Sequence, residues 1–198
     1  MNNEFSMTTG QAHEVAQAFG RNGWTNEQVK EATKGNFFGK VLDVILGHSE
    51  IKPIEYLIDF DKTPSVPEGW TILPDYEQLL NRMRGMVRFT PAMVKLHLDA
   101  GQKNGKVIKG DELREKLEKV PVYGAQLLDF YLANQSLIPE DWQGKYIFFW
   151  GTIYRRVGGF LYVRYLYWND DEWSCRCSWL GLSLGGLGVC SPAAVSAS

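Results

Sequence analysis

Two cysteines near the C-terminus, Cys175 and Cys177, are the side chains of this sequence that most readily suggest chemistry. Residues i and i+2 of a β-strand point to the same face, so a strand here would place both thiols side by side. A tetrahedral zinc site needs two further ligands. The three histidines, His13, His48 and His97, are far away in sequence and show no ligand spacing. We therefore predict no bound metal and no cofactor.

Other catalytic patterns are also missing from the sequence. It contains no Gly-x-Ser-x-Gly nucleophile turn, no His-Glu-x-x-His pair and no glycine-rich phosphate loop, and the run 181–188 is not followed by Lys-Ser/Thr. Asp170 and Asp171 are expected in a solvated turn. A disulfide with Cys190 has little support in a chain without an export signal. We predict no catalytic residues and no enzyme activity.

Length and charge set the broad class of protein. The chain has 198 residues, 22.5 kDa and a formal net charge of -2, which suits one domain or a domain with a small appendage. The balanced charge argues against a nucleic-acid partner. The sequence begins with no secretory signal, and no apolar run reaches the ~20 residues that span a bilayer. We expect no membrane span and a cytoplasmic protein, with surface display left open.

The composition changes abruptly near residue 145. Residues 1–145 contain 12 Lys, 8 Gln and 5 Met, whereas residues 146–198 contain none of the three. Of the 26 aromatic residues, 13 fall between Trp142 and Trp179, and all the cysteines lie in the same tail. A β-rich half that follows a helical half explains part of this bias, because strands favour aromatics and disfavour Lys. It does not explain why Cys, Ser, Gly, Arg and Tyr gather together.

The first part of the chain predicts a small helical module. Thr25 and Gln28 have the spacing of a capping box, and apolar residues recur at helical spacing from Phe37 to Leu46 before Gly47. Prolines and glycines then punctuate 61–76. We predict an N-terminal helical module with its linker over 1–76 and a second domain over 77–198.

The second domain is predicted to follow the order strand, helix, helix, strands, an α+β arrangement. The expected strands are 87–89, 94–98, 146–154, 161–168, 172–180 and a short last strand within 192–198, and the expected helices are 111–120 and 125–134. In 161–168, Tyr165 and Tyr167 fall on one face and Tyr162 on the other. This Tyr-rich strand has two interpretations, which are cross-strand packing and a recognition surface.

Four segments of the tail carry a family resemblance. They are Phe149-Trp-Gly-Thr-Ile-Tyr-Arg155, Leu161-x-Val-Arg-x-Leu-x-Trp168, Trp173-x5-Trp179-Leu180 and Pro192-Ala-Ala-Val-x-Ala-Ser198. The chain resembles a family of proteins abundant in bacteria of candidate phyla, and its tail is similar to the variable regions of diversity-generating retroelement target proteins. In such systems a reverse transcriptase that errs at adenines rewrites the end of the target gene. The resemblance covers roughly 85–198 and implies a C-type lectin-like fold, with a variable region over about 146–198.

The genetic code agrees with this resemblance. An AAC codon randomised at both adenines yields Ser, Cys, Arg, Gly, Tyr and Phe but never Lys, Gln or Met, the residue types missing from the tail. The Trp codon TGG contains no adenine. Trp150, Trp168, Trp173 and Trp179 are therefore expected to be fixed framework positions.

These observations predict a ligand-binding protein with a diversified surface. Tyr, Ser and Gly with Arg at hot spots is the composition of a paratope. The partner is expected to be a macromolecule of unknown identity, most simply a protein. The predicted ligand-binding residues are Arg156, Phe160, Tyr162, Tyr165, Tyr167, Asn169, Ser174, Arg176, Ser178, Gly181 and Ser183. Because Tyr162 faces away from Tyr165 in an ideal strand, a single binding face requires a twist or a bulge there.

Two alternatives remain open from the sequence. The C-type lectin-like fold is shared, by resemblance, with formylglycine-generating oxidases that use active-site cysteines, which draws attention to Cys175 and Cys177. The helices of 9–34 instead suggest an adaptor that binds a partner through its N-terminus.

Overall fold

The computed structural model of the chain describes residues 5–52, 54–79, 81–185 and 193–196, and it divides the chain into two units, Met1–Pro53 and Ile54–Ser198. The predicted boundary after residue 76 therefore lies too late in the chain. The physical reason is strand pairing. β1 (Tyr56–Asp59) pairs with β3 (Met86–Phe89), and β2 (Trp70–Ile72) pairs with β6 (Ile147–Arg156), so the expected linker belongs to the second unit.

The first unit consists of three helices, α1 (Thr9–Arg21), α2 (Asn26–Ala32) and α3 (Phe37–Ile45). The predicted capping box is confirmed at the start of α2. The Thr25 hydroxyl accepts from the Gln28 amide at 3.2 Å, and the Gln28 side chain accepts from the Thr25 amide at 2.9 Å. These two bonds satisfy backbone donors that a helix start otherwise leaves unpaired.

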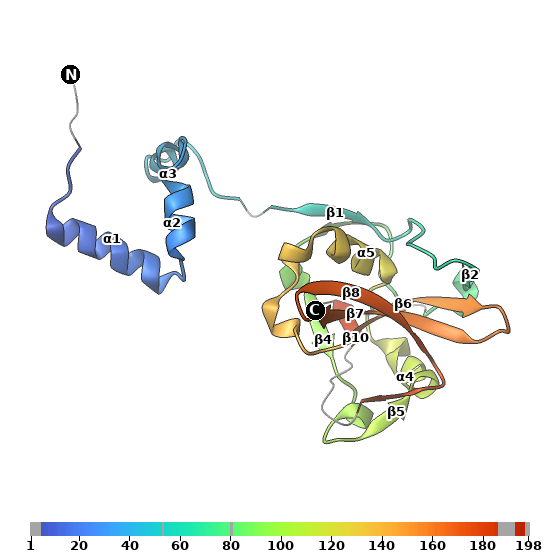
Figure 1. Cartoon of the computed structure of the whole chain (residues 1–198). Coiled ribbons are helices and arrows are strands. Elements are labelled where there is room, and N and C mark those ends of the chain that lie inside the picture. The colour runs from blue at the N-terminus through green and yellow to red at the C-terminus, as the bar shows by residue number, and fades with distance from the viewer. Residues whose placement is uncertain (1–4, 53, 80, 186–192, 197–198) are drawn as a thin grey trace. The chain divides into compact units, whose positions relative to one another are not determined.

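The second unit is a mixed α+β fold (Figure 1). Its remaining elements are β4 (Val94–His97), β5 (Val107–Lys109), α4 (Gly110–Lys116), α5 (Ala125–Ala133), β7 (Leu161–Asn169), β8 (Glu172–Trp179), β9 (Ser183–Gly185) and β10 (Ala193–Ser196). The predicted strands and helices of this half are confirmed within a few residues at each end, and β5 and β9 are additional short strands. No helix within the described ranges is long and apolar enough to cross a membrane.

The main sheet has the strand order β4-β10-β6-β7-β8, with β2 paired to the far end of β6. Strands β6, β7 and β8 form an antiparallel meander, while β10 runs antiparallel to β4 and parallel to β6. The last strand thus inserts beside a strand that precedes both helices. Two separate two-stranded sheets are formed, one by β1 with β3 and the other by β5 with β9.

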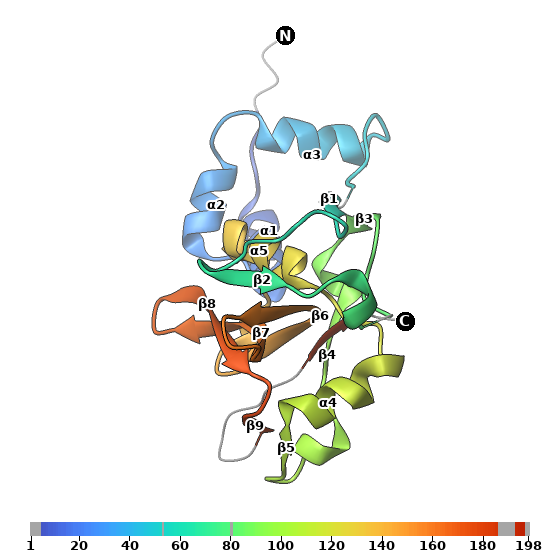
Figure 2. The same cartoon turned by 90° about the vertical axis from the view of Figure 1, so that its right-hand side faces the viewer.

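Helices α5 and α4 cover opposite faces of this sheet (Figures 1 and 2). On the α5 face, Leu127, Leu128 and Tyr131 pack with Leu166 and Trp173. On the α4 face, a second core contains Leu113, Leu117 and Val163, among others. Because both faces are covered, β6 is buried from residue 147 to 154, which explains why apolar and aromatic residues dominate its sequence.

An irregularity in β6 connects the tail to the start of α5. The pairing of β6 with β7 shifts register between Phe148 and Ile153. Within this bulge the Gly151 amide donates to the Tyr123 carbonyl at 2.9 Å, and Thr152 Oγ1 accepts from the Ala125 amide at 3.0 Å. A Cβ at residue 151 would lie 2.7 to 2.9 Å from the backbone of 123–124, so only glycine fits there.

Candidate binding surface

The face of the sheet that carries Tyr165 presents aromatic, hydroxyl and guanidinium groups. Strands β7 and β8 pair without interruption, and this register places Arg176 beside Tyr165 and Ser174 beside Tyr167. Alternation puts these four side chains on one face of the sheet. Tyr146, just before β6, adds a further ring. We call these five residues the Tyr165 face.

The rings of the Tyr165 face contact one another in a row. Centroids lie 5.3 Å apart for Tyr146 and Tyr165, and 5.9 Å apart for Tyr165 and Tyr167. Arg176 Cζ lies 5.1 Å from the centroid of the Tyr167 ring, within the range of a cation–π contact. Phe148 stacks against Tyr165 at 5.0 Å and joins the row to the α4-side core. Tyr165 is therefore anchored to the core by this stack.

Partial burial gives this face the chemistry of a binding surface. The three tyrosines keep one side in solvent, and Arg176 is exposed. Burial raises the pKa of Tyr165. A protonated tyrosine hydroxyl can donate as well as accept a hydrogen bond. Rigid rings with polar tips lose little entropy on binding, which is why Tyr and Arg dominate protein-binding hot spots.

Tyr162 lies on the opposite face, so the predicted residues do not form a single patch. Its ring contacts Trp70 at a centroid distance of 4.4 Å and is paired with Trp179 in the β7–β8 register. Phe160 is exposed and packs edge-on against Trp179 at 5.8 Å. The bulge that a single face requires occurs in β6, not in β7, and therefore leaves the alternation of the tyrosines unchanged.

The remaining predicted residues differ in accessibility. Arg156 is exposed at the β6–β7 turn, where its amide donates to the Phe160 carbonyl at 3.0 Å. Asn169 is exposed at the β7–β8 turn, and Ser183 is exposed in β9 opposite Lys109.

Two of the predicted residues are poorly placed for ligand contact. Ser178 is only 9% exposed, because it pairs with the buried Val163. A Cβ at Gly181 would lie 2.4 Å from the Trp179 ring, so any side chain there displaces that indole. Both residues serve the packing of the strand ends better than they serve a ligand.

The predicted framework tryptophans are mostly internal. Trp150 is fully buried, Trp173 is 5% exposed, and Trp168 is partly buried against the same core as Trp173. Trp168 and Trp173 are paired across β7 and β8, with ring centroids 5.3 Å apart. Trp179 is 39% exposed and is the exception.

Arg164 is the residue of the tail that sequence reasoning missed. It is 5% exposed, and its guanidinium donates to Asp129 Oδ1 of α5 at 2.8 Å and to the Ser65 carbonyl at 3.1 Å. A third bond, 3.4 Å long, reaches Cys175 Sγ. The available signal was its position between Leu166 and Tyr162 on the core-facing side of an alternating strand.

The cysteines share the face of Arg164, as alternation predicts. Cys175 and Cys177 are half-buried and not bonded to each other. Burial raises the pKa of Cys177 and favours the neutral thiol, which is the less nucleophilic form. Among the described residues no group of three His, Cys, Asp or Glu side chains is placed to hold a metal ion. Cys190 lies outside the described residues, so the predicted weakness of a disulfide stays a prediction.

Comparison of the chain with models of known families, with curated proteins and with solved structures gives no significant match.

Proposed function

We propose that this protein binds a macromolecular ligand, most simply a protein, through the Tyr165 face of its C-terminal sheet. We further propose that a retroelement diversifies this face by adenine-directed mutagenesis. The observation that carries the proposal is the division of residue types between the two sides of β7 and β8. In the middle of the two strands, Tyr165, Tyr167, Ser174 and Arg176 occupy the partly exposed side, whereas Arg164, Leu166 and Trp173 occupy the buried side.

The topology supports a C-type lectin-like scaffold for this surface. A first strand, β4, precedes two helices and a three-stranded meander, and the last strand, β10, returns to pair with β4. A fold closed in this way holds its strands from both ends, so that side chains on the outer face of the meander can change without unfolding the core. Phe160 and Tyr162 lie on other surfaces and would provide secondary contacts at most.

Two matched libraries of the full chain test the proposal. One randomises the Tyr165-face positions Tyr165, Tyr167, Ser174 and Arg176. The other randomises Arg164, Leu166, Trp173 and Cys175, neighbours on the same two strands. Surface display with protease challenge measures which members are folded, and selection against a panel of unrelated proteins then identifies the members that bind.

We expect most members of the first library to stay folded and to yield specific binders, and most members of the second to be lost. The proposal is contradicted if the two libraries lose folded members equally. It is also contradicted if the folded members of the first library yield no binder.

A further inference from the structure

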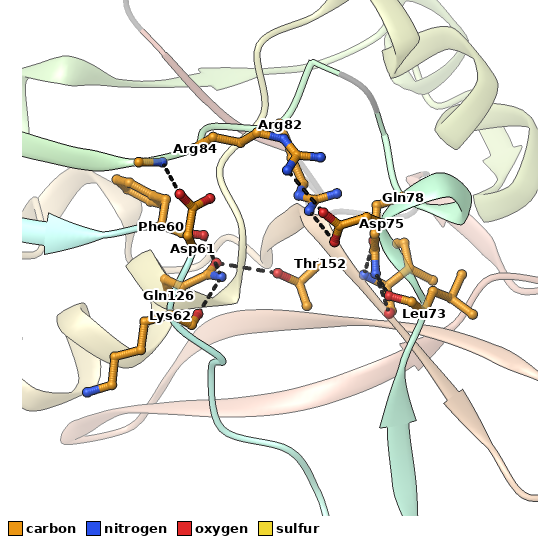
Figure 3. A network of polar contacts seen from close by, with 12 residues as sticks. Phe60, Asp61, Lys62, Leu73, Asp75, Gln78, Arg82, Arg84, Gln126 and Thr152 are labelled. Carbon is orange, nitrogen blue, oxygen red and sulfur yellow. Dashed lines mark hydrogen bonds and ion pairs between the residues drawn. The ribbon is translucent and has the colours of Figure 1, made fainter.

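A polar cleft of about 320 Å³ lies in the second unit, and Figure 3 shows the polar side chains around it. Its volume is at the lower end of small-molecule sites, which run from about 300 Å³ upward. The lining comes from the loop after β1, from the segment after β2 and from the β6 bulge, together with Gln126 of α5. The residues that matter for the argument are Asp61, Lys62, Asp75, Arg82, Arg84 and Thr152.

The glutamines in this cleft are already fully engaged. Gln126 Nε2 donates to the carbonyls of Phe60 and Lys62 at 2.9 Å each, and its Oε1 lies 3.5 Å from the Thr152 hydroxyl. Gln78 donates to the Leu73 carbonyl at 2.9 Å and accepts from a β6 amide. These bonds hold the three segments together, so the cleft is preformed.

The hydrogen-bonding capacity that remains is mainly cationic. Asp61 accepts from the Gly85 amide at 3.1 Å. Arg82 Nη1 is buried and bonds to no described residue, and Lys62 is exposed. A buried donor without an acceptor is costly, so an arriving acceptor is favoured once the guanidinium turns toward it.

The Asp75 carboxylate already forms ion pairs with both arginines of the cleft. Arg82 Nη2 donates to Asp75 Oδ1 at 2.8 Å and Arg84 Nη1 to Asp75 Oδ2 at 3.1 Å (Figure 3). The Asp75 side chain is 73% exposed, and Asp75 belongs to a short 3-10 helix, Asp75–Glu77. The pair of Arg84 with Asp75 is exposed on both sides, and exposed ion pairs contribute little, so an external anion can displace the Asp75 carboxylate from Arg84 at small cost.

We propose that this cleft binds a small oxyanion, a carboxylate or a phosphate group, between Arg82 and Arg84, with Asp75 as an internal competitor. Two guanidinium groups that converge on one carboxylate define the geometry of an oxyanion clamp. Lys62 and Thr152 also belong to the lining, and the Thr152 hydroxyl is already bonded within the chain. The site shares no residue with the Tyr165 face.

An NMR titration of the full-length chain tests this site. Inorganic phosphate and succinate are added separately, with sodium chloride at matched ionic strength as the reference, and the Gly151 and Thr152 amides and the Arg84 Nε–H report the cleft. Shifts with phosphate alone identify a phosphate ligand, and shifts with succinate alone a carboxylate. Shifts with both identify a shared oxyanion site. Shifts no larger than with chloride, or confined to other regions, overturn the proposal.

Three variants distinguish binding in the cleft from a nonspecific effect of added anions, because they are expected to weaken, strengthen and leave unchanged the affinity. Arg84→Gln removes one charge-assisted bond and should weaken binding about tenfold. Asp75→Asn removes the competitor and should strengthen binding about fivefold or more, since it frees both guanidinium groups. Arg88→Gln, an exposed change that breaks only an ion pair with Glu55, is the control and should leave affinity unchanged. Equal effects of Arg84→Gln and Arg88→Gln, or weaker binding by Asp75→Asn, would overturn the proposal.

Discussion

Arg164 of β7 and Asp129 of α5 form an ion pair, with Arg164 Nη1 2.8 Å from Asp129 Oδ1, in the interior of the second unit. The Arg164 side chain is 6% exposed and the Asp129 side chain 26%. Tyr165, the next residue along β7, points to the other face and forms the centre of the predicted binding surface. One strand thus carries both an anchor to the helix and a display position.

The first prediction is that Asp129→Asn destabilises the protein by about 2–3 kcal/mol, because it leaves the buried guanidinium without its counter-charge. Glu55→Gln removes a carboxylate from the exposed pair with Arg88 and should cost less than about 0.5 kcal/mol. Urea unfolding measures both variants. Equal costs for the two would show that Arg164 does not depend on Asp129.

The second prediction concerns the contact between the β6 bulge and α5. Gly151→Ala should destabilise the protein by about 1–3 kcal/mol, since the new methyl group meets backbone atoms that cannot move aside. Gly20→Ala in α1, where nothing lies within 4 Å of the added Cβ, is the matched control and should be neutral or slightly stabilising. Thermal unfolding compares them. A Gly151→Ala variant as stable as Gly20→Ala refutes the tight contact.

The third prediction is a loss of stability at alkaline pH. Burial raises the pKa of Tyr154 from the ordinary tyrosine value of 10.0 to about 12, and its hydroxyl donates to the Ser65 carbonyl at 3.1 Å. A group whose pKa is raised by folding contributes stability below its unfolded pKa and loses it as pH rises to the folded value. Stability should therefore fall between about pH 10 and pH 12 through this group.

Absorbance of tyrosinate during an alkaline titration checks the Tyr154 assignment. The Tyr154→Phe variant should lose amplitude from the late part of the curve and keep the part near pH 10 (about the ordinary tyrosine pKa). Loss of amplitude from the early part instead would place Tyr154 in solvent.

The fourth prediction is that Cys177→Ser leaves folding and ligand binding by the Tyr165 face unchanged. Cys177 lies on the other side of β8 from Arg176, and burial favours its neutral thiol. Circular dichroism and binding by a clone selected from the Tyr165-face library measure the two properties. A variant that keeps its fold but loses a thiol-dependent oxidation would favour the oxidase interpretation.

Local patterns predicted most of the second unit, because alternation and helical periodicity act over a few residues. These local patterns predict the two faces of β7, the turn at 169–171 and the buried row of α5, which consists of Leu127, Leu128 and Tyr131. Pairings between distant segments do not leave such a pattern. The β2–β6 pair and the Arg164–Asp129 bond join residues far apart in the sequence. The strand pair places residues 70–72 in the second unit, before the predicted boundary, and the bond holds Arg164 in the interior.

The candidate site was predicted only in part for a related reason. Strand alternation places Tyr162 and Tyr165 on opposite faces of the sheet although both are tyrosines, so a common residue type does not imply a common surface. Composition also says nothing about neighbours, and the burial of Ser178 beside Val163 is set by cross-strand register. The cleft at Arg82 and Arg84 has no sequence motif, because its lining comes from four separate segments.

The central claim is that the tail is rewritten at positions of the Tyr165 face, and the nucleotide sequence around the gene tests it most directly. We predict a nearby copy of the 3′ end, beside a reverse-transcriptase gene. It should differ from the coding copy only where the template has adenine, with changes in the codons of Tyr165, Tyr167, Ser174 and Arg176 and none in those of Trp150 and Trp173. Absence of such a copy, or differences spread equally over the buried tryptophan codons, would contradict the account.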